Sequence, residues 1–79
     1  MIPQTLNTIP EGGKVQVSRL LSSGSMRRRL LDIGLIPGTR VVCTAVSPAG
    51  DPAAYLIRGA VIAIRSEDSA KILVDRPMS

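Results

Sequence analysis

The sequence predicts a small barrel that is mainly β, with about five strands and one short helix inserted between strands 1 and 2. Two observations support this class. Apolar residues make up 44% of the 79-residue chain and are almost all aliphatic, since Tyr55 is the only aromatic residue. Seven glycines and six prolines divide the chain into short segments, most of them rich in β-branched residues. A chain this short forms one domain, so we expect residues 1–79 to fold as a single unit.

Five segments have the composition of strands. Residues 14–21 alternate apolar and polar side chains, as a half-buried strand does. The other predicted strands are residues 40–46, 53–58, 61–65 and 72–74, and the polar residues 66–71 form about one helical turn before the last of them. Residues 1–8 are expected to begin loosely, with Leu6 and Ile9 holding this end to the core. This arrangement fits a small SH3-like barrel.

The helix is predicted within residues 25–39. Ser25 is a suitable N-cap because its hydroxyl can accept a hydrogen bond from the first turn. Met26, Leu30 and Ile33 follow at helical spacing and share one face. Residues 34–35 (GL) match a left-handed helix stop, and residues 36–39 (IPGT) carry the proline and glycine of a type II turn.

The charges of this helix are unusual. Arg27, Arg28 and Arg29 lie in its first turn and Asp32 in its last, so both signs oppose the helix dipole, each by about 0.3–1 kcal/mol if exposed. Helix stability does not explain this pattern. The arginines either form a solvated basic face or contact a partner.

Four residues are candidates for partner binding. Leu31 lies between the helix faces beside Arg27, so it packs in the core, which we prefer, or joins Arg27 and Arg28 in a docking patch, where arginine is enriched. Tyr55 either caps the barrel edge or contacts the partner. One aromatic residue is too few for the proline-rich peptide groove of ordinary SH3 domains.

The side chains exclude most catalytic functions. The chain has no histidine, the usual general base near neutral pH. Its single cysteine, Cys43, has no imidazole partner and is expected to be a small buried residue. Residues 12–15 (GGKV) lack the spacing of a phosphate-binding loop. We predict that the protein is not an enzyme and holds no cofactor.

Metal binding has few candidate ligands. A tight transition-metal site draws on histidine and cysteine, so none is expected within one chain. Carboxylates offer at most a weak oxygen site, and a site shared across a dimer stays open; the candidates are Asp51, Glu67, Asp68 and Asp75.

Charge and hydropathy limit the location. The net charge of +4 suits an acidic partner, RNA or an anionic membrane surface. The longest apolar run, residues 60–64, is far below the ~20 residues needed to cross a bilayer. The first residues do not resemble a signal peptide. We expect a cytoplasmic protein without an integral membrane segment, and self-association stays open.

The sequence resembles the FeoA family of bacterial ferrous iron uptake. Residues 29–39 (RLLDIGLIPGT) are similar to the family's basic-Leu-x-acidic-apolar-Gly-Leu-x-Pro-Gly-Thr block, and residues 48–52 (PAGDP) to its Pro-x-Gly-Asp-Pro loop. The C-terminal pattern also agrees, at Arg58, Gly59, Ala63, Arg65, Ala70, Ile72 and Val74. One departure is Ala60, where a larger residue often stands.

The resemblance implies an SH3-like barrel and a non-enzymatic accessory role beside FeoB, the membrane ferrous iron transporter with a GTP-binding domain. The partner is then the cytoplasmic part of FeoB, which puts the protein at the inner face of the membrane. Any link to iron comes from the resemblance alone. The alternatives are a small basic barrel that binds nucleic acid, disfavoured by the single aromatic residue, and a stand-alone relative of the SH3-like domain of metal-dependent repressors.

Overall fold

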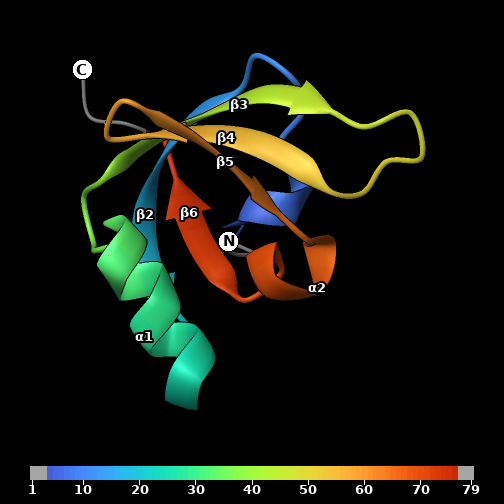
Figure 1. Ribbon diagram of the computed structural model, residues 1–79. Coiled ribbons are helices and arrows are strands. Elements are labelled where there is room, and N and C mark those ends of the chain that lie inside the picture. The colour runs from blue at the N-terminus through green and yellow to red at the C-terminus, as the bar shows by residue number, and fades with distance from the viewer. Residues whose placement is uncertain (1–3, 77–79) are drawn as a thin grey trace.

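The computed structural model describes residues 4–76. In this part of the chain six strands form one antiparallel sheet in the order β1-β6-β2-β3-β4-β5. The strands are β1 (Gln4–Thr5), β2 (Lys14–Leu20), β3 (Arg40–Val46), β4 (Ala53–Ile57), β5 (Ala60–Ile64) and β6 (Ile72–Asp75). The helices are η1 (Leu6–Thr8), α1 (Gly24–Ile33) and α2 (Ser66–Ser69). The sheet curls, so that β3, β4 and β5 lie over β2 and β6 (Figure 1).

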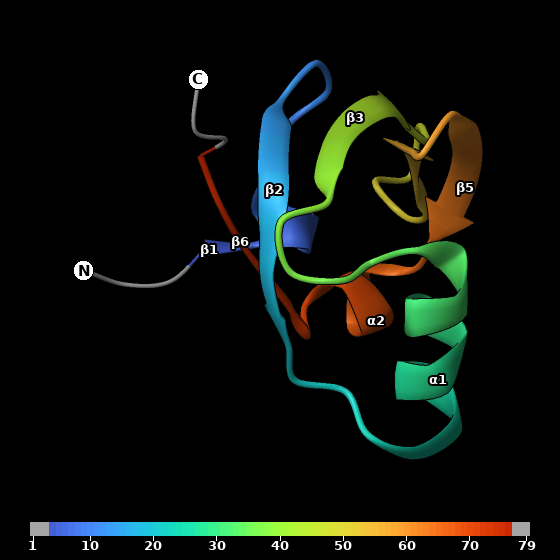
Figure 2. The ribbon, with the colours of Figure 1, turned by 90° about the vertical axis from the view of Figure 1, so that its left-hand side faces the viewer.

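The mainly β prediction is confirmed, and each of the five predicted strands is present with ends shifted by at most one residue. Helix α1 is inserted between β2 and β3, as expected, and Figure 2 shows it below the end of β5. The start of the chain was less well predicted. Residues 1–3 lie outside the described residues, but residues 4–8 form β1 and η1. Two residues of strand carry no periodic signal, and β1 exists only because β6 offers a partner. Leu6 and Ile9 are buried as predicted.

The N-terminus of α1 differs from the prediction. Ser23, not Ser25, is the N-cap residue, and its side chain makes no capping hydrogen bond. Ser25 lies inside the first turn. The run of small polar residues 22–25 offers several equivalent caps, so the path of the chain from β2 decides which one is used.

The C-terminus of α1 follows the prediction. Gly34 is left-handed, with φ of 108°. Its N–H donates to the Leu31 carbonyl at 3.0 Å, and the Leu35 N–H donates to the Leu30 carbonyl at 3.0 Å, which together make a Schellman motif. Both Leu30 and Leu35 are buried. The helix therefore ends in a rigid, apolar-anchored stop.

The turn after α1 is joined to β2. The Thr39 N–H donates to the Ile36 carbonyl at 3.0 Å, and Gly38 has φ of 91°, as a type II turn requires. Val17 exchanges hydrogen bonds with this turn, since its carbonyl accepts from Gly38 at 2.7 Å and its N–H donates to Thr39 at 2.8 Å. These bonds hold the C-terminal end of α1 against the middle of β2.

The core is aliphatic apart from Tyr55 and Cys43. Each fully buried aliphatic side chain stabilises the fold by about 1.5–3 kcal/mol. Cys43 is 1% exposed, so the prediction of a buried cysteine is confirmed. The core residues are Leu6, Ile9, Val15, Val17, Leu20, Leu30, Leu35, Val41, Cys43, Tyr55, Ile57, Ile64, Ile72 and Val74.

Candidate functional site

Arg27, Arg28 and Leu31 lie together on the outer side of α1, where they line a shallow cavity with Gly24 and Asp32. Leu31 keeps 36% of its surface exposed, so the preference for core packing of this residue was wrong. Leu30 is the one fully buried residue of α1, so the strip of the helix surface that packs on the core is narrow. Leu31 lies one residue, or about 100°, beyond it and faces solvent.

A second cavity connects this side of α1 to the neighbouring strand. Arg27 and Leu31 line it together with Arg19, Leu20 and Pro37, and its volume is about 330 Å³. We call Arg19, Arg27, Arg28, Leu31 and Pro37 the basic α1 surface. It surrounds one exposed leucine with three arginines, an arrangement typical of protein-docking patches.

In the described chain, the arginines of the basic α1 surface form no ion pair with Asp32, the acid that lines the first cavity beside Arg27 and Arg28. Within residues 4–76, Arg19, Arg27 and Arg28 make no ion pair and no side-chain hydrogen bond. The first turn of α1 holds no acidic residue either. The positive end of the helix dipole and the arginines therefore add, and an acidic partner would be attracted to both.

Tyr55 does not belong to this surface. It is 1% exposed, and its hydroxyl donates to the Leu6 carbonyl at 3.5 Å. Burial raises the pKa of Tyr55, while a hydrogen bond with Ser69 lowers it in part. The ring presents no surface to a partner, so the structure removes Tyr55 from the candidate site and gives it a role in the core, joining β4 to η1 and α2.

Asp51, considered above as a metal ligand, has a structural partner. Its carboxylate accepts hydrogen bonds from the Ser66 N–H at 2.8 Å and from the Ser66 hydroxyl at 3.2 Å. It thus caps the start of α2 from the loop between β3 and β4. Within residues 4–76 no group of three or more His, Cys, Asp or Glu side chains is placed to hold a metal ion.

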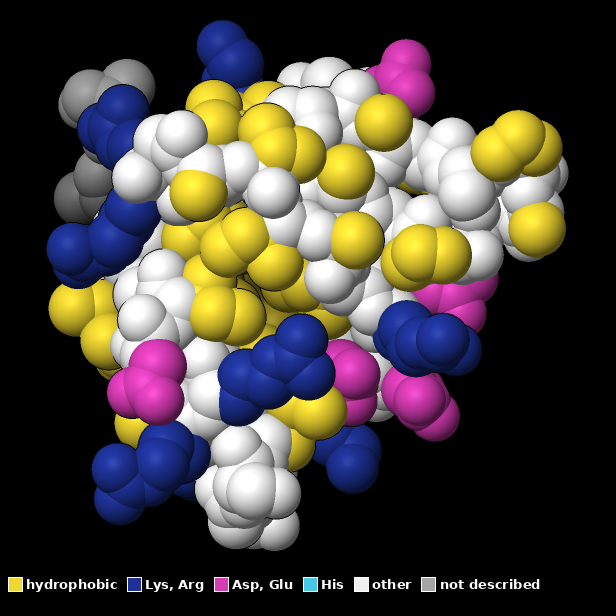
Figure 3. All heavy atoms as spheres, in the orientation of Figure 1, with side chains coloured by type: hydrophobic (Ala, Val, Ile, Leu, Met, Phe, Trp, Pro, Cys, Tyr) yellow, Lys and Arg dark blue, Asp and Glu magenta, His cyan; other side chains and the backbone are white. Residues whose placement is uncertain are grey.

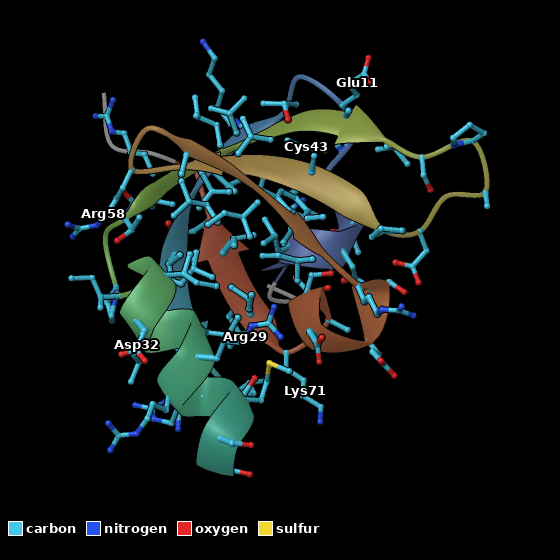
Figure 4. The ribbon with its side chains drawn as sticks, in the orientation of Figure 1. Glu11, Arg29, Asp32, Cys43, Arg58 and Lys71 are labelled. Atoms are coloured by element: carbon cyan, nitrogen blue, oxygen red, sulfur yellow. The ribbon has the colours of Figure 1, made fainter. Side chains whose placement is uncertain are left out.

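Two features around α1 were not predicted from the sequence. Arg19 and Pro37 join the site only because the turn after α1 pairs with β2, which no local pattern reveals. Arg29 points to the other side of the helix, toward the gap between α1 and α2 (Figure 4). That split could have been found, because helical spacing places Arg29 beside Met26 and Ile33 and away from Leu31.

In the described chain, no helix is both long and apolar enough to span a bilayer.

A curled antiparallel sheet with an inserted helix and a basic outer surface defines a small SH3-like domain. The chain belongs to the FeoA family, since residues 4–76 match the FeoA domain. This confirms the family resemblance and the SH3-like fold class.

One relative and two solved structures illustrate the similarity. The Fe(2+) transport protein A/Fe(2+) transporter FeoB fusion protein of Porphyromonas gingivalis is 30% identical over 70 residues, which cover 89% of this chain and only 8% of that protein. The FeoA-like protein from Clostridium acetobutylicum is 28% identical, with a TM-score of 0.87 over 100% of this chain and 92% of that chain. Stenotrophomonas maltophilia FeoA, a prokaryotic SH3 domain protein complexed with zinc, shares the fold at 24% identity, with a TM-score of 0.81 over 91% of this chain and 89% of that chain.

Proposed function

We propose that this protein is a non-enzymatic accessory protein of bacterial ferrous iron uptake. It binds the cytoplasmic part of a FeoB-type transporter through the basic α1 surface and modulates the nucleotide cycle or the assembly of that transporter. One observation carries the proposal. In the Porphyromonas gingivalis relative, Fe(2+) transport protein A and the Fe(2+) transporter FeoB form one fusion protein. Covalent linkage raises the effective concentration of a weak binding partner, which is the advantage of fusing proteins that already associate.

The basic α1 surface supports this proposal. Leu31 supplies an apolar contact, and Arg19, Arg27 and Arg28, which form no ion pair within the described chain, supply charge around it. Charges at the edge of an interface mainly raise the association rate and set its salt dependence. We therefore expect a complex that forms at the inner face of the membrane, with an acidic patch on the transporter.

The remaining chemistry favours binding over catalysis. The sequence holds no histidine. Burial raises the pKa of the Cys43 thiol, so at neutral pH it is protonated and a poor nucleophile.

A binding assay tests the proposal. The purified chain is titrated with the cytoplasmic region of the transporter, with and without guanine nucleotide, and then with the whole transporter in membranes. Arg27→Glu plus Arg28→Glu should weaken binding by at least tenfold, the effect of about 1.4 kcal/mol. Lys14→Glu plus Arg76→Glu changes the net charge equally and is the control, because both residues are exposed and lie near the end of β2 opposite α1.

Two outcomes would contradict the proposal. The first is the absence of binding in every nucleotide state and to the whole transporter. The second is equal binding by the two charge-reversed variants, since the basic α1 surface would then not be the contact.

Nucleic-acid binding is the competing function, but Tyr55, the only aromatic residue, is buried and offers no base a stacking surface. Oligonucleotide affinity that falls steeply with salt would favour it.

A further inference from the structure

Strand β5 forms an edge of the sheet, because β4 is its one neighbour in the strand order. The two strands are joined by a two-residue turn in which Arg58 and Gly59 have φ of 50° and 83°, the pattern of a type I′ hairpin. The residues beside such a turn, Ile57 and Ala60, form a hydrogen-bonded pair, and bonded pairs then alternate. Ala60, Ile62 and Ile64 therefore bond to β4.

The backbone groups of Val61 and Ala63 point the other way, out of the sheet. Within residues 4–76 no turn, loop or further strand donates to them or accepts from them. These two N–H groups and two C=O groups form an open ladder on which another strand can pair.

The side chains of β5 do nothing to discourage such pairing. The strand reads AVIAI, without charge, proline or glycine, and Val61 is 64% exposed. Natural edge strands usually carry a lysine, a proline or a bulge that prevents association with other chains. Strand β5 has none of these features in its sequence, so its edge is open to pairing with another strand.

A groove with an apolar floor and charged rim runs beside this edge. It has a volume of about 130 Å³ and lies between α1 and β5. Its apolar lining is Met26, Leu30, Ile33, Ile62, Ala63 and Ile64. Figure 3 shows it as a hollow with a yellow floor at the centre of that face, with a basic side chain on its rim. An added strand would turn every second side chain into this groove.

The charges on the groove select the partner. Arg29 reaches toward it from α1 (Figure 4), and Arg65 lies where β5 ends. Asp68 also lines the groove, but within residues 4–76 neither arginine forms an ion pair or a side-chain hydrogen bond. The groove thus carries two cations against one anion. A second copy of this chain would pair through another β5, which itself carries no acid for either arginine, so it fits the groove poorly.

We propose that the edge of β5 is a strand-addition site for an extended segment of the transporter's cytoplasmic part, whose groove-facing side chains are apolar at the groove floor and acidic beside Arg29 and Arg65. The segment pairs with Val61 and Ala63, places its apolar side chains in the groove and its carboxylates against Arg29 and Arg65. This inference rests on the proposed function, because the partner is the same, and adds a second contact on the opposite side of α1.

Amide hydrogen exchange in the complex tests the pairing directly. With the cytoplasmic region of the transporter bound, exchange at the Val61 and Ala63 amides should slow by at least tenfold. Ala63→Pro removes one outward N–H without removing a bond to β4, and should weaken binding at least tenfold. Ala63→Ser keeps the N–H, adds only a hydroxyl to the groove that Ala63 lines, and is the matched control. Arg29→Glu plus Arg65→Glu gives an independent test that leaves the backbone of β5 intact.

The outcomes separate the two proposals. If the transporter region binds, the two amides stay unprotected, and the proline and double-glutamate variants bind as well as wild type, strand addition is wrong and the accessory function stands. If nothing binds in any nucleotide state, both are wrong. If protection of Val61 and Ala63 rises with the concentration of the free chain instead, a second copy occupies the edge and the inference is overturned.

Discussion

The side chain of Arg58 lies across Gly34. A Cβ atom on residue 34 would come within 2.6 Å of Arg58 Cδ and 2.8 Å of its Nε, so only glycine allows the approach. Figure 4 shows Arg58 beside the turn that follows α1. The guanidinium group is thus held near the negative end of the α1 dipole, which favours a cation. The β4–β5 turn and the end of α1 are joined by this contact.

Gly34→Ala should therefore destabilise the protein by more than backbone strain alone. A left-handed alanine costs about 1–2 kcal/mol. The flexible Arg58 side chain would move aside, so the added loss is its contact with the C-terminal end of α1, about 0.3–1 kcal/mol. Urea unfolding measures the loss. Gly50→Ala is the control, because Gly50 has φ of 88° but a Cβ there would meet nothing within 4 Å. Equal losses at the two positions would show that the Arg58 contact contributes nothing.

Charge reversal in α1 should separate stability from binding. Arg27→Glu places an acid in the first turn of α1 and should raise the free energy of unfolding by about 0.3–1 kcal/mol. Arg28→Glu lies beyond that turn and four residues before Asp32, so it should bring no gain in stability. Both should weaken binding to the transporter. Thermal unfolding in low salt and the titration described above measure the two effects. A variant that loses both stability and binding would point to a structural role of these arginines.

Adjacent leucines should behave differently. Leu30 is 2% exposed, so Leu30→Ala removes core packing and should cost about 2–5 kcal/mol of stability. Leu31 is 36% exposed, so Leu31→Ala should cost less than about 1 kcal/mol and should weaken binding to the transporter. Chemical denaturation and titration of both variants decide this. Unchanged binding by Leu31→Ala would remove Leu31 from the docking surface.

Removal of the cap on α2 should weaken the fold locally. Asp51→Ala takes away both acceptors of Ser66 and should cost about 0.5–2 kcal/mol. Hydrogen exchange at α2 should then speed up more than exchange at β2. Asp32→Ala is the control, since within residues 4–76 Asp32 makes no hydrogen bond or ion pair and lies at the unfavourable end of its helix. An equal loss in both variants would contradict the capping role.

Alkaline pH should destabilise the protein through two buried groups. Burial raises the pKa of both Cys43 and Tyr55 in the folded state. The folded state therefore holds these protons more tightly than the unfolded state, and this stability is fully present below the unfolded pKa of a thiol, about 8.5. It is lost as pH rises further. Unfolding free energies at pH 7 and pH 10 should differ less in Cys43→Val than in wild type, and an equal difference would exclude Cys43 as a source.

Local patterns determined the elements of this fold and the stop of its helix. Alternating or β-branched runs between glycines and prolines marked the strands, and β3 was predicted to the residue. Gly34, Leu35 and the Pro37–Gly38 turn marked the end of α1, because a left-handed stop and a type II turn depend on neighbouring residues alone. The arginine run likewise indicated a charged surface that helix stability does not explain, although α1 begins at Gly24 and only Arg27 lies in its first turn.

Only the tertiary structure decided which side chains share a surface. Tyr55 was buried by contacts with η1 and α2, which are distant in sequence, whereas Leu31 was left exposed because the inner face of α1 is narrow. Arg19 reached α1 because the turn at Gly38 pairs with β2. The open edge of β5 is visible only in the order of the sheet. Burial and edge position arise from long-range packing, on which a local sequence pattern carries little information.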